Sequence, residues 1–307
     1  MHVVSEQFLD VSELERKSRE ELVAIAKELG MENGAALTNL RREDVLSRIV
    51  HSHPDQQALR GSGILDTMGD GYGFLRHNGL KPGHGDIYVS QSQIRRFGLR
   101  SGDTVSGQVR APKGGERYFG LTRVDKVNDL EPDRARIRPV FEELTPIFPD
   151  NQIHLENDPE NLTARMIDLF APIGRGQRGL IVSPPKAGKT TILKQIAAGA
   201  TLNCPEIHIM VVLIGERPEE VTDMRRSIKG EVFGSTFDES VEDQCRLADL
   251  ALDRAKRLVE SDKDVLVLMD SITRATRAYN LALPSSGRTL SGGIDPIALY
   301  PPKRFFG

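Results

Sequence analysis

One segment constrains the fold of this chain more than any other, the sequence SPPKAGKT at Ser183–Thr190. It follows the phosphate-loop pattern G-x-x-x-x-G-K-[ST], with Ser183 in place of the usual first glycine. The apolar run Leu180–Val182 precedes it as an expected strand, and a helix is expected over 188–199. A strand, a tight loop and a helix in this order direct backbone N–H groups at a phosphate. The segment therefore predicts a nucleotide site in an α/β fold.

The residue types in this loop suit a nucleotide bound with Mg²⁺. Lys189 is expected to bridge the β- and γ-phosphates, and the Thr190 hydroxyl to hold the metal. Phosphate oxygens are expected to accept from the backbone N–H groups of Ala187, Gly188, Lys189, Thr190 and Thr191. The structural alternative is a lysine in an incidental glycine turn.

Two further apolar runs end in carboxylates. Ile207–Ile214 leads to Glu216, and Val265–Met269 leads directly to Asp270. Continuous apolar runs are typical of strands buried on both faces, and alternating strands and helices indicate a parallel sheet. At its edge, Asp270 would position Mg²⁺ and Glu216 would polarise the attacking water. Taken singly, Asp270 could be a helix cap, and Glu216 could pair with Arg217.

A second module is visible in the distribution of charge. Residues 61–127 contain ten Lys and Arg and six Asp and Glu, although the whole chain has a net charge of −3. They also hold six of the aromatic residues. Glycine-rich turns, including Gly61–Gly63, separate short runs rich in aromatic and β-branched residues. These runs predict the strands of a small barrel: Tyr72–Arg76, Asp86–Val89, Thr104–Arg110 and Tyr118–Arg123.

The barrel carries a candidate surface for single-stranded nucleic acid. Tyr72 and Phe74 are two residues apart and so lie on one face of a strand, where exposed rings can stack on bases. Glu116 could accept a hydrogen bond from a base edge. The same groove is expected to include Arg76, Tyr88, Arg95, Arg96 and Arg117. The structural alternative places one or both rings in the barrel core.

These patterns divide the chain into a helical subdomain over 1–52, a barrel over 61–127, a proline-rich linker over 128–150 and an α/β domain over 151–307. In the first region, Ser12 with Glu15 and Ser18 with Glu21 each match a helix capping box.

Several classes of protein are excluded. No apolar run approaches the ~20 residues that span a bilayer, and the N-terminus lacks the layout of a secretory signal. The two cysteines, Cys204 and Cys245, have neither disulfide-scaffold nor zinc-site spacing. We therefore expect a cytoplasmic protein without membrane association.

Together the motifs resemble the bacterial transcription termination factor Rho family over roughly 60–307. The similarity lies in Gly71–Arg76, Asp86–Ser90, Gln93–Phe97, Gly115–Tyr118, Pro184–Thr190, Gly215–Val221, Asp270–Arg274 and Pro302–Gly307. It implies an OB-fold or cold-shock-like barrel followed by a RecA-like P-loop ATPase core. It also implies a ring-shaped homohexamer that moves 5′→3′ along RNA and releases RNA polymerase, with elongation factors as further partners.

The resemblance also assigns roles to residues. It implies a primary site for pyrimidine-rich single-stranded RNA formed by Tyr72, Phe74, Arg76, Tyr88, Glu116, Arg117 and Tyr118. It implies an RNA contact in the ring channel for Arg288, in the loop 284–293. In the nucleotide site it implies loop roles for Lys186, Lys189 and Thr190, a catalytic Glu216, a Mg²⁺-associated Asp270, and support from Arg217 and Arg274.

One departure from the family concerns length. Rho-type chains continue beyond the segment Pro302–Gly307 with a second channel loop and an arginine finger, and neither can be assigned within 1–307. Because an arginine finger contributes ~10³–10⁵ in rate, we expect this chain alone to turn over little ATP. Two alternatives remain. One is a non-catalytic RNA-binding fragment, and the other is a rotary ATP-synthase-type subunit, which Pro172–Arg178 also resembles.

Overall fold

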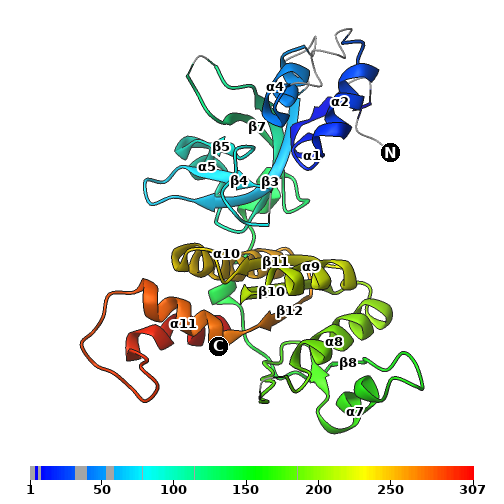
Figure 1. The fold of residues 1–307 in the computed structure, drawn as a ribbon, viewed down its shortest axis with the longest axis vertical. Coiled ribbons are helices and arrows are strands. Elements are labelled where there is room, and N and C mark those ends of the chain that lie inside the picture. The colour runs from blue at the N-terminus through cyan, green and yellow to red at the C-terminus, as the bar shows by residue number, and fades with distance from the viewer. Residues whose placement is uncertain are drawn as a thin grey trace. The chain divides into compact units, whose positions relative to one another are not determined.

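The computed structural model describes residues 4–5, 8–31, 40–52, 59–77, 79–113, 115–184 and 186–307. Parts of the expected helical subdomain, the turn residue Gly114 and Pro185 of the phosphate loop lie outside the described residues. The chain forms two compact units, Met1–Arg138 and Pro139–Gly307 (Figure 1). Among the described helices, none is both long and apolar enough to cross a membrane.

The first unit is built on a β-barrel, as the sequence predicts. One sheet has the strand order β1-β2-β3-β4-β5-β7-β6, and β3 also pairs with β6, which closes a ring of the last five strands. The helices α5 (Gln91–Phe97) and α6 (Pro132–Arg136) follow β5 and β7. The strands are β1 (Val4–Ser5), β2 (Phe8–Asp10), β3 (Leu59–Thr67), β4 (Gly73–Arg76), β5 (Ile87–Val89), β6 (Thr104–Arg110) and β7 (Phe119–Val127).

The expected turn at Gly61–Gly63 is wrong, because these residues lie inside β3. A Cβ atom at Gly63 would lie 2.9 Å from the carbonyl oxygen of Arg76 on β4. A Cβ atom at Gly61 would lie 2.5 Å from Cδ1 of Ile87. Glycine is therefore required here by the close approach of β4 and of the Ile87 side chain, and not by a turn.

Among the residues described before the barrel, three segments are helical: α1 (Val11–Leu14), α2 (Arg19–Glu28) and α4 (Arg42–Ser52). The capping box of Ser18 and Glu21 is confirmed. The one expected for Ser12 and Glu15 is wrong, because Asp10 caps α1 and accepts from the N–H of Ser12 at 2.8 Å. The Ser12 hydroxyl instead accepts from the backbone N–H of Ser62 on β3 at 2.6 Å.

The helices and the barrel share one hydrophobic core. Leu14 and Leu22 from the helices are fully buried in the same cluster as Leu59, Leu75 and Ile87 from the barrel strands. The helical segment is therefore packed as part of the first unit and does not form a core of its own.

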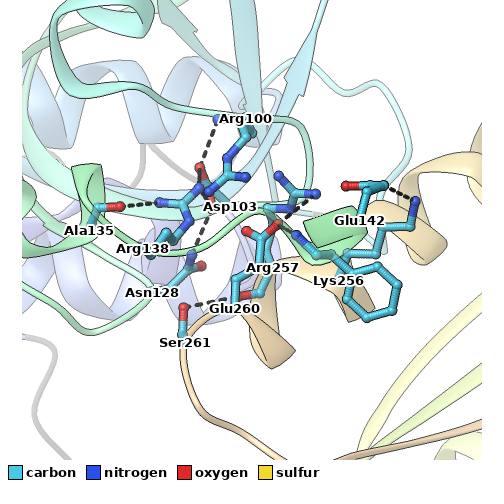
Figure 2. Close-up of polar contacts among 11 residues, drawn as sticks. Arg100, Asp103, Asn128, Ala135, Arg138, Glu142, Lys256, Arg257, Glu260 and Ser261 are labelled. Carbon is cyan, nitrogen blue, oxygen red and sulfur yellow. Dashed lines mark hydrogen bonds and ion pairs between the residues drawn. The ribbon is translucent and has the colours of Figure 1, made fainter. Parts of the chain in front are cut away.

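A buried ion pair closes the C-terminal end of the first unit (Figure 2). Arg138 donates from Nη2 to both carboxylate oxygens of Asp103, at 2.7 and 2.6 Å, and the two side chains are 2% and 0% exposed. Asp103 also accepts from Nδ2 of Asn128 at 2.7 Å and from the backbone N–H of Arg100 at 2.8 Å. The first part of the expected linker is thus ordered by these contacts.

The second unit contains a parallel sheet of three described strands in the order β11-β10-β12 and a small antiparallel pair, β8 with β9. Its strands are β8 (Gln152–Ile153), β9 (Ile173–Gly174), β10 (His208–Glu216), β11 (Glu231–Thr236) and β12 (Val265–Asp270). Its helices are η2 (Phe141–Glu143), α7 (Leu162–Phe170), α8 (Lys189–Asn203), α9 (Pro218–Ser227), α10 (Val241–Val259), α11 (Ile272–Ala282), η3 (Pro296–Leu299) and α12 (Tyr300–Phe306).

The central strand β10 is buried from Ile209 to Glu216, which confirms a strand covered on both faces. Side chains of one face, including Val211 and Leu213, share a core cluster with Leu193 of α8 and Val221 of α9. This packing fixes the helices that follow the phosphate loop and β10 relative to the sheet.

The strand expected at Leu180–Val182 is wrong. These residues form no strand, and Leu180 and Val182 are 63% and 82% exposed. A β-strand is held by its neighbour's backbone, and no described strand pairs with this segment. The apolar run therefore precedes the phosphate loop as irregular backbone.

The start of the second unit is anchored on α10 (Figure 2). The backbone N–H of Phe141 donates to Oε1 of Glu260 at 2.9 Å, and Glu260 also pairs with Arg257 at 3.2 Å. Lys256 pairs with Glu142 at 2.6 Å and lies 5.5 Å from the centre of the Phe141 ring. The linker expected over 128–150 therefore contains two short helices, α6 and η2. Polar contacts hold Arg138, which follows α6, and Phe141, which begins η2.

We predict that Asp103→Ala lowers the free energy of unfolding of the first unit by about 3–5 kcal/mol, because it leaves the Arg138 guanidinium buried without its carboxylate. Urea unfolding of the full chain, followed by hydrogen exchange in peptides from 59–138, measures this. The control Asp125→Ala removes a half-exposed partner of Arg60 and Arg123 and should cost under about 1 kcal/mol. Equal effects of both substitutions would contradict the structural role of the buried pair.

Candidate nucleotide and RNA sites

The phosphate loop leads directly into α8. Gly188 is the N-cap of this helix with a φ of 89°, a left-handed conformation that favours glycine. The Lys189 ammonium donates to the carbonyl oxygens of Ser183 at 2.9 Å and Pro184 at 3.4 Å. Lys186, Ala187, Gly188 and Thr191 are exposed, so the loop surface is open to a ligand.

The carboxyl ends of β10 and β12 meet beside this loop. Parallel pairing sets Asp270, the last residue of β12, opposite Leu213 of β10, and β10 ends at Glu216. The Thr190 hydroxyl of α8 donates to Oδ2 of Asp270 at 2.9 Å. The structure thus brings the start of α8 together with Asp270, one of the two predicted carboxylates.

Arg274 of α11 connects the second carboxylate to the same edge. Its Nε lies 2.8 Å from Oε1 of Glu216, and its Nη1 donates to the carbonyl oxygen of Gly215 at 2.8 Å. Arg217 caps α9 and has an exposed side chain. Arg274 therefore fixes the orientation of Glu216, whereas the Arg217 side chain makes no hydrogen bond or ion pair with the described part of the loop.

Burial raises the pKa of Glu216 to about 8, together with a hydrogen bond to Glu220 and the negative charge of Asp270. The guanidinium of Arg274 acts in the opposite direction and lowers this pKa. Glu220 is a neighbour that the sequence reasoning missed. Its position four residues after Glu216, in the first turn of α9, was the only available signal.

The donor set suits a hard cation. A hydroxyl and a carboxylate from Thr190 and Asp270 are oxygen donors of the kind that Mg²⁺ prefers. Within the described ranges, no group of three or more His, Cys, Asp or Glu side chains could hold a metal by itself. The two oxygen donors of Thr190 and Asp270 fit a Mg²⁺ ion whose other positions are filled by phosphate oxygens and water.

On the barrel, four aromatic rings form one cluster, which we call the ring platform: Tyr72, Phe74, Tyr88 and Tyr118. The centre of the Phe74 ring lies 5.8 Å from that of Tyr72, 6.0 Å from that of Tyr88 and 4.9 Å from that of Tyr118. Tyr88 is 39% exposed and the other three rings are partly exposed. The platform is therefore at the surface and not in the barrel core.

Polar side chains surround the platform. The guanidinium of Arg117 lies 5.5 Å from the centre of the Tyr118 ring, and its Nη2 is 3.0 Å from Nδ1 of His84. Glu116 receives two hydrogen bonds from Arg110, which help lower the pKa of its carboxyl to about 2. His84 and Arg110 were missed from the sequence, because neither lies beside an aromatic residue in a strand pattern.

Arg76 differs from the expectation that it lines the RNA groove. Its guanidinium is buried, donates to Oδ2 of Asp66 from Nε at 2.9 Å and Nη2 at 2.7 Å, and pairs with Asp86. It also lies 5.2 Å from the centre of the Phe74 ring. Its charge is therefore already compensated inside the barrel, beneath the platform.

Comparisons with known proteins identify both domains. Residues 61–133 match the family model described as Rho termination factor, RNA-binding domain. Residues 163–289 match the ATP synthase alpha/beta family, nucleotide-binding domain. The transcription termination factor Rho of Pseudomonas fluorescens biotype C is 50% identical over 97% of this chain and 72% of its own length.

The chain belongs to the Rho family.

Two other members show how much of the chain is shared. Rho of Pseudomonas aeruginosa is 49% identical over 97% of this chain and 72% of its own length. Rho of Streptomyces lividans is 59% identical over 82% of this chain and 36% of its own length. The fold is thus a Rho RNA-binding barrel with preceding helices and a RecA-like nucleotide-binding domain of the ATP synthase type.

The loop that contains Arg288, the channel residue implied by the Rho resemblance, is closed on itself. Asp295 accepts at Oδ2 from the backbone N–H of Ser286 at 2.7 Å, and its own N–H donates to Oδ1 of Asn280 at 2.7 Å. Arg288 lies between these anchors with an exposed side chain. The structure therefore presents it on an ordered loop.

We predict that Glu216→Gln makes the chain more stable than its parent at pH 8 and leaves its stability unchanged near pH 4.5. A carboxyl with a raised folded pKa holds its proton in the folded state, so the parent loses stability as pH rises from about 4.5 to about 8. The difference at pH 8 should exceed about 1 kcal/mol, measured by urea unfolding without nucleotide. The exposed control Glu219→Gln should follow the parent, and a pH-independent effect of Glu216→Gln would contradict the shift.

Proposed function

We propose that this chain is the RNA-binding and ATP-hydrolysing part of a 5′→3′ RNA translocase that terminates transcription by releasing RNA polymerase. The observation that carries the proposal is the presence, in one chain, of a surface ring platform and a phosphate loop with converging carboxylates. Assembly as a cytoplasmic homohexamer and cooperation with elongation factors belong to the same proposal. The chain spans 72% of the length of its Pseudomonas relatives.

On the RNA side, bases of a pyrimidine-rich single strand would stack on Tyr72, Phe74, Tyr88 and Tyr118. Arg117, held over the Tyr118 ring, would contact a base face or a phosphate, and the ionised Glu116 would accept from a base edge. Arg76 would act from below, by holding Phe74 in place. Arg288 would contact RNA from the second unit.

On the ATP side, Lys189 would exchange its carbonyl partners for the β- and γ-phosphates. Lys186, Arg217 and the backbone from Ala187 to Thr191 would surround the same phosphates. Thr190 and Asp270 would hold Mg²⁺, which neutralises phosphate charge when it is bound. Glu216, oriented by Arg274, would accept the proton of the attacking water in its ionised form, which becomes more populated as pH rises toward the raised pKa of about 8.

Two alternatives give different results in the same experiments. A rotary ATP-synthase-type subunit is favoured by the second family match, but it accounts for neither the Rho RNA-binding match nor the ring platform. A non-catalytic RNA-binding protein would bind RNA and show no hydrolysis of ATP under any condition.

We predict that Lys189→Ala weakens binding of Mg·ATP at least tenfold, because it removes the cation that faces the phosphates. In a chain of the full length of its Pseudomonas relatives, Glu216→Gln should retain binding and lower RNA-stimulated hydrolysis by about 10²–10⁴-fold, since it removes the proton acceptor. Calorimetric titration and a phosphate-release assay measure the two effects. The control is Lys194→Ala. Lys194 lies on α8, the helix that also carries Lys189, and pairs at the surface with Asp223 of α9, so this variant should match the parent. Parental hydrolysis by Glu216→Gln would refute the catalytic assignment.

We predict that Phe74→Ala and Tyr88→Ala each lower the affinity for oligocytidine RNA by about 1–3 kcal/mol, the energy of one base–ring stack. Fluorescence anisotropy with labelled RNA measures the change. Phe148→Ala is the control, because this ring is 91% exposed in the second unit and lies outside the platform. The platform would not be the RNA site if only Phe148→Ala lowered the affinity, or if none of the three variants did.

A further inference from the structure

A groove lies between α5 and β7 of the first unit. It consists of two adjoining hollows of about 460 and 480 Å³ that share Arg96, Phe97, Arg123 and Val124. The sequence reasoning placed Arg96 with the platform residues, but the structure places it across this groove from Arg123. No ring of the platform lines either hollow.

One half of the groove is suited to an anion. Its lining adds the polar side chains of Ser92, Gln93 and Thr122 to the two guanidinium groups and includes no carboxylate. The other half contains Asp125, Glu131 and Asp133 with Lys126. The half without carboxylates therefore adjoins a half with three of them. An anion is expected to lie in the first half and to be repelled from the second.

The walls of this half are held in place. Gln93 donates from Nε2 to the carbonyl oxygen of Leu121 on β7 at 3.0 Å, and Ser90 and Gln93 form the capping box of α5. The guanidinium of Arg96 lies 5.2 Å from the centre of the Phe97 ring. Both the helix and one of its cations are thus positioned before any ligand binds.

The two guanidinium groups are available to a ligand. Among the described residues, no carboxylate pairs with Arg96. The Arg123 side chain is 75% exposed and pairs with Asp125 at 3.3 Å, while Asp125 also pairs with Arg60 at 3.5 Å. Exposed ion pairs of this kind contribute about 0–1 kcal/mol, so Arg123 can exchange its partner for a phosphate at little cost.

The two elements that line the groove, α5 and β7, each follow a platform residue closely in the chain. Tyr88 lies on β5, which leads through Ser90 into α5, and Tyr118 directly precedes β7. Arg123 is five residues beyond Tyr118, a distance of about 17 Å at the ~3.3 Å rise of a strand. A strand of RNA that leaves the platform along β7 therefore reaches the groove within a few nucleotides.

We propose that this groove binds the phosphodiester backbone of the RNA strand whose bases stack on the ring platform, with Arg96 and Arg123 contacting phosphates. The inference rests on the proposed RNA-binding function and extends it to a second contact region. Guanidinium groups with neighbouring hydroxyls match phosphate oxygens, and no base-stacking surface is needed there. An acidic peptide could also occupy a site of this charge, and the experiment below distinguishes peptide binding from RNA binding.

The test compares oligocytidines of about four and about twelve nucleotides, which lie near the limits of one barrel's site size. The double variant Arg96→Gln/Arg123→Gln should bind the shorter RNA as the parent does and the longer RNA at least tenfold more weakly. For the longer RNA, the slope of log K against log salt should fall by about 1.4, since each phosphate contact contributes about 0.7. The control Arg41→Gln/Arg134→Gln removes the same charge from exposed positions outside the groove and should leave that slope unchanged.

Four results would overturn the proposal. The double variant could bind the longer RNA with parental affinity and slope, or it could lose affinity equally for both lengths, which would place the two arginines at the platform. The control could reduce the slope as much, which would indicate a general charge effect. Loss of binding to a polyglutamate peptide with unchanged RNA binding would identify the acidic-peptide site instead. Failure of the parent to bind either RNA would refute the proposed function itself. That outcome differs from the four above, because in each of them the parent binds RNA.

Discussion

The nucleotide site depends on the parallel pairing of one buried strand. β10 pairs with β11 on one edge and β12 on the other, and side chains cover both of its faces. Because buried backbone groups need hydrogen-bond partners, this strand can keep its place only if both neighbours are in register. The same register sets Asp270 opposite Leu213, three residues before Glu216. The positions of both carboxylates thus follow from the main-chain hydrogen bonds of one strand.

In the barrel, the corresponding interaction is the buried pairing of Arg76 with two carboxylates. Arg76 lies on β4, Asp66 lies on β3, and Asp86 directly precedes β5, so the three charges join consecutive strands. Asp86 also accepts from the backbone N–H of Gly83 at 2.9 Å. Burying a guanidinium is costly unless its donors are matched, and two acceptors on different strands match them only in the assembled sheet. The Phe74 ring of the platform lies over this network.

The parts of the fold that were predictable are those that depend on local patterns. The capping box at Ser18 and Glu21 and the buried run that forms β10 need no information from distant residues. Arg76 could not be assigned correctly, because an arginine beside exposed rings has the same sequence whether it faces RNA or two buried carboxylates. Gly61–Gly63 has the composition of a turn, and only the approach of β4 and Ile87 explains it. Leu180–Val182 has the composition of a strand but lacks a described neighbour to pair with.

The segment between the two units shows the same dependence on distant partners. Its four prolines favour an irregular linker over 128–150, yet Arg138 is fixed to Asp103 and the backbone of Phe141 is fixed to Glu260. These anchors are three residues apart in the chain. At ~3.6 Å per extended residue, the chain that joins them is at most about 11 Å long, whatever orientation the two units take. Lengthening this connection would require breaking one anchor, at a cost of about 3–5 kcal/mol for the buried pair of Arg138 and Asp103 or about 1.5–3 kcal/mol for the part-buried hydrogen bond from Phe141 to Glu260. Each end of this connection is therefore held by contacts made within its own unit, Arg138 with Asp103 in the first and Phe141 with Glu260 in the second.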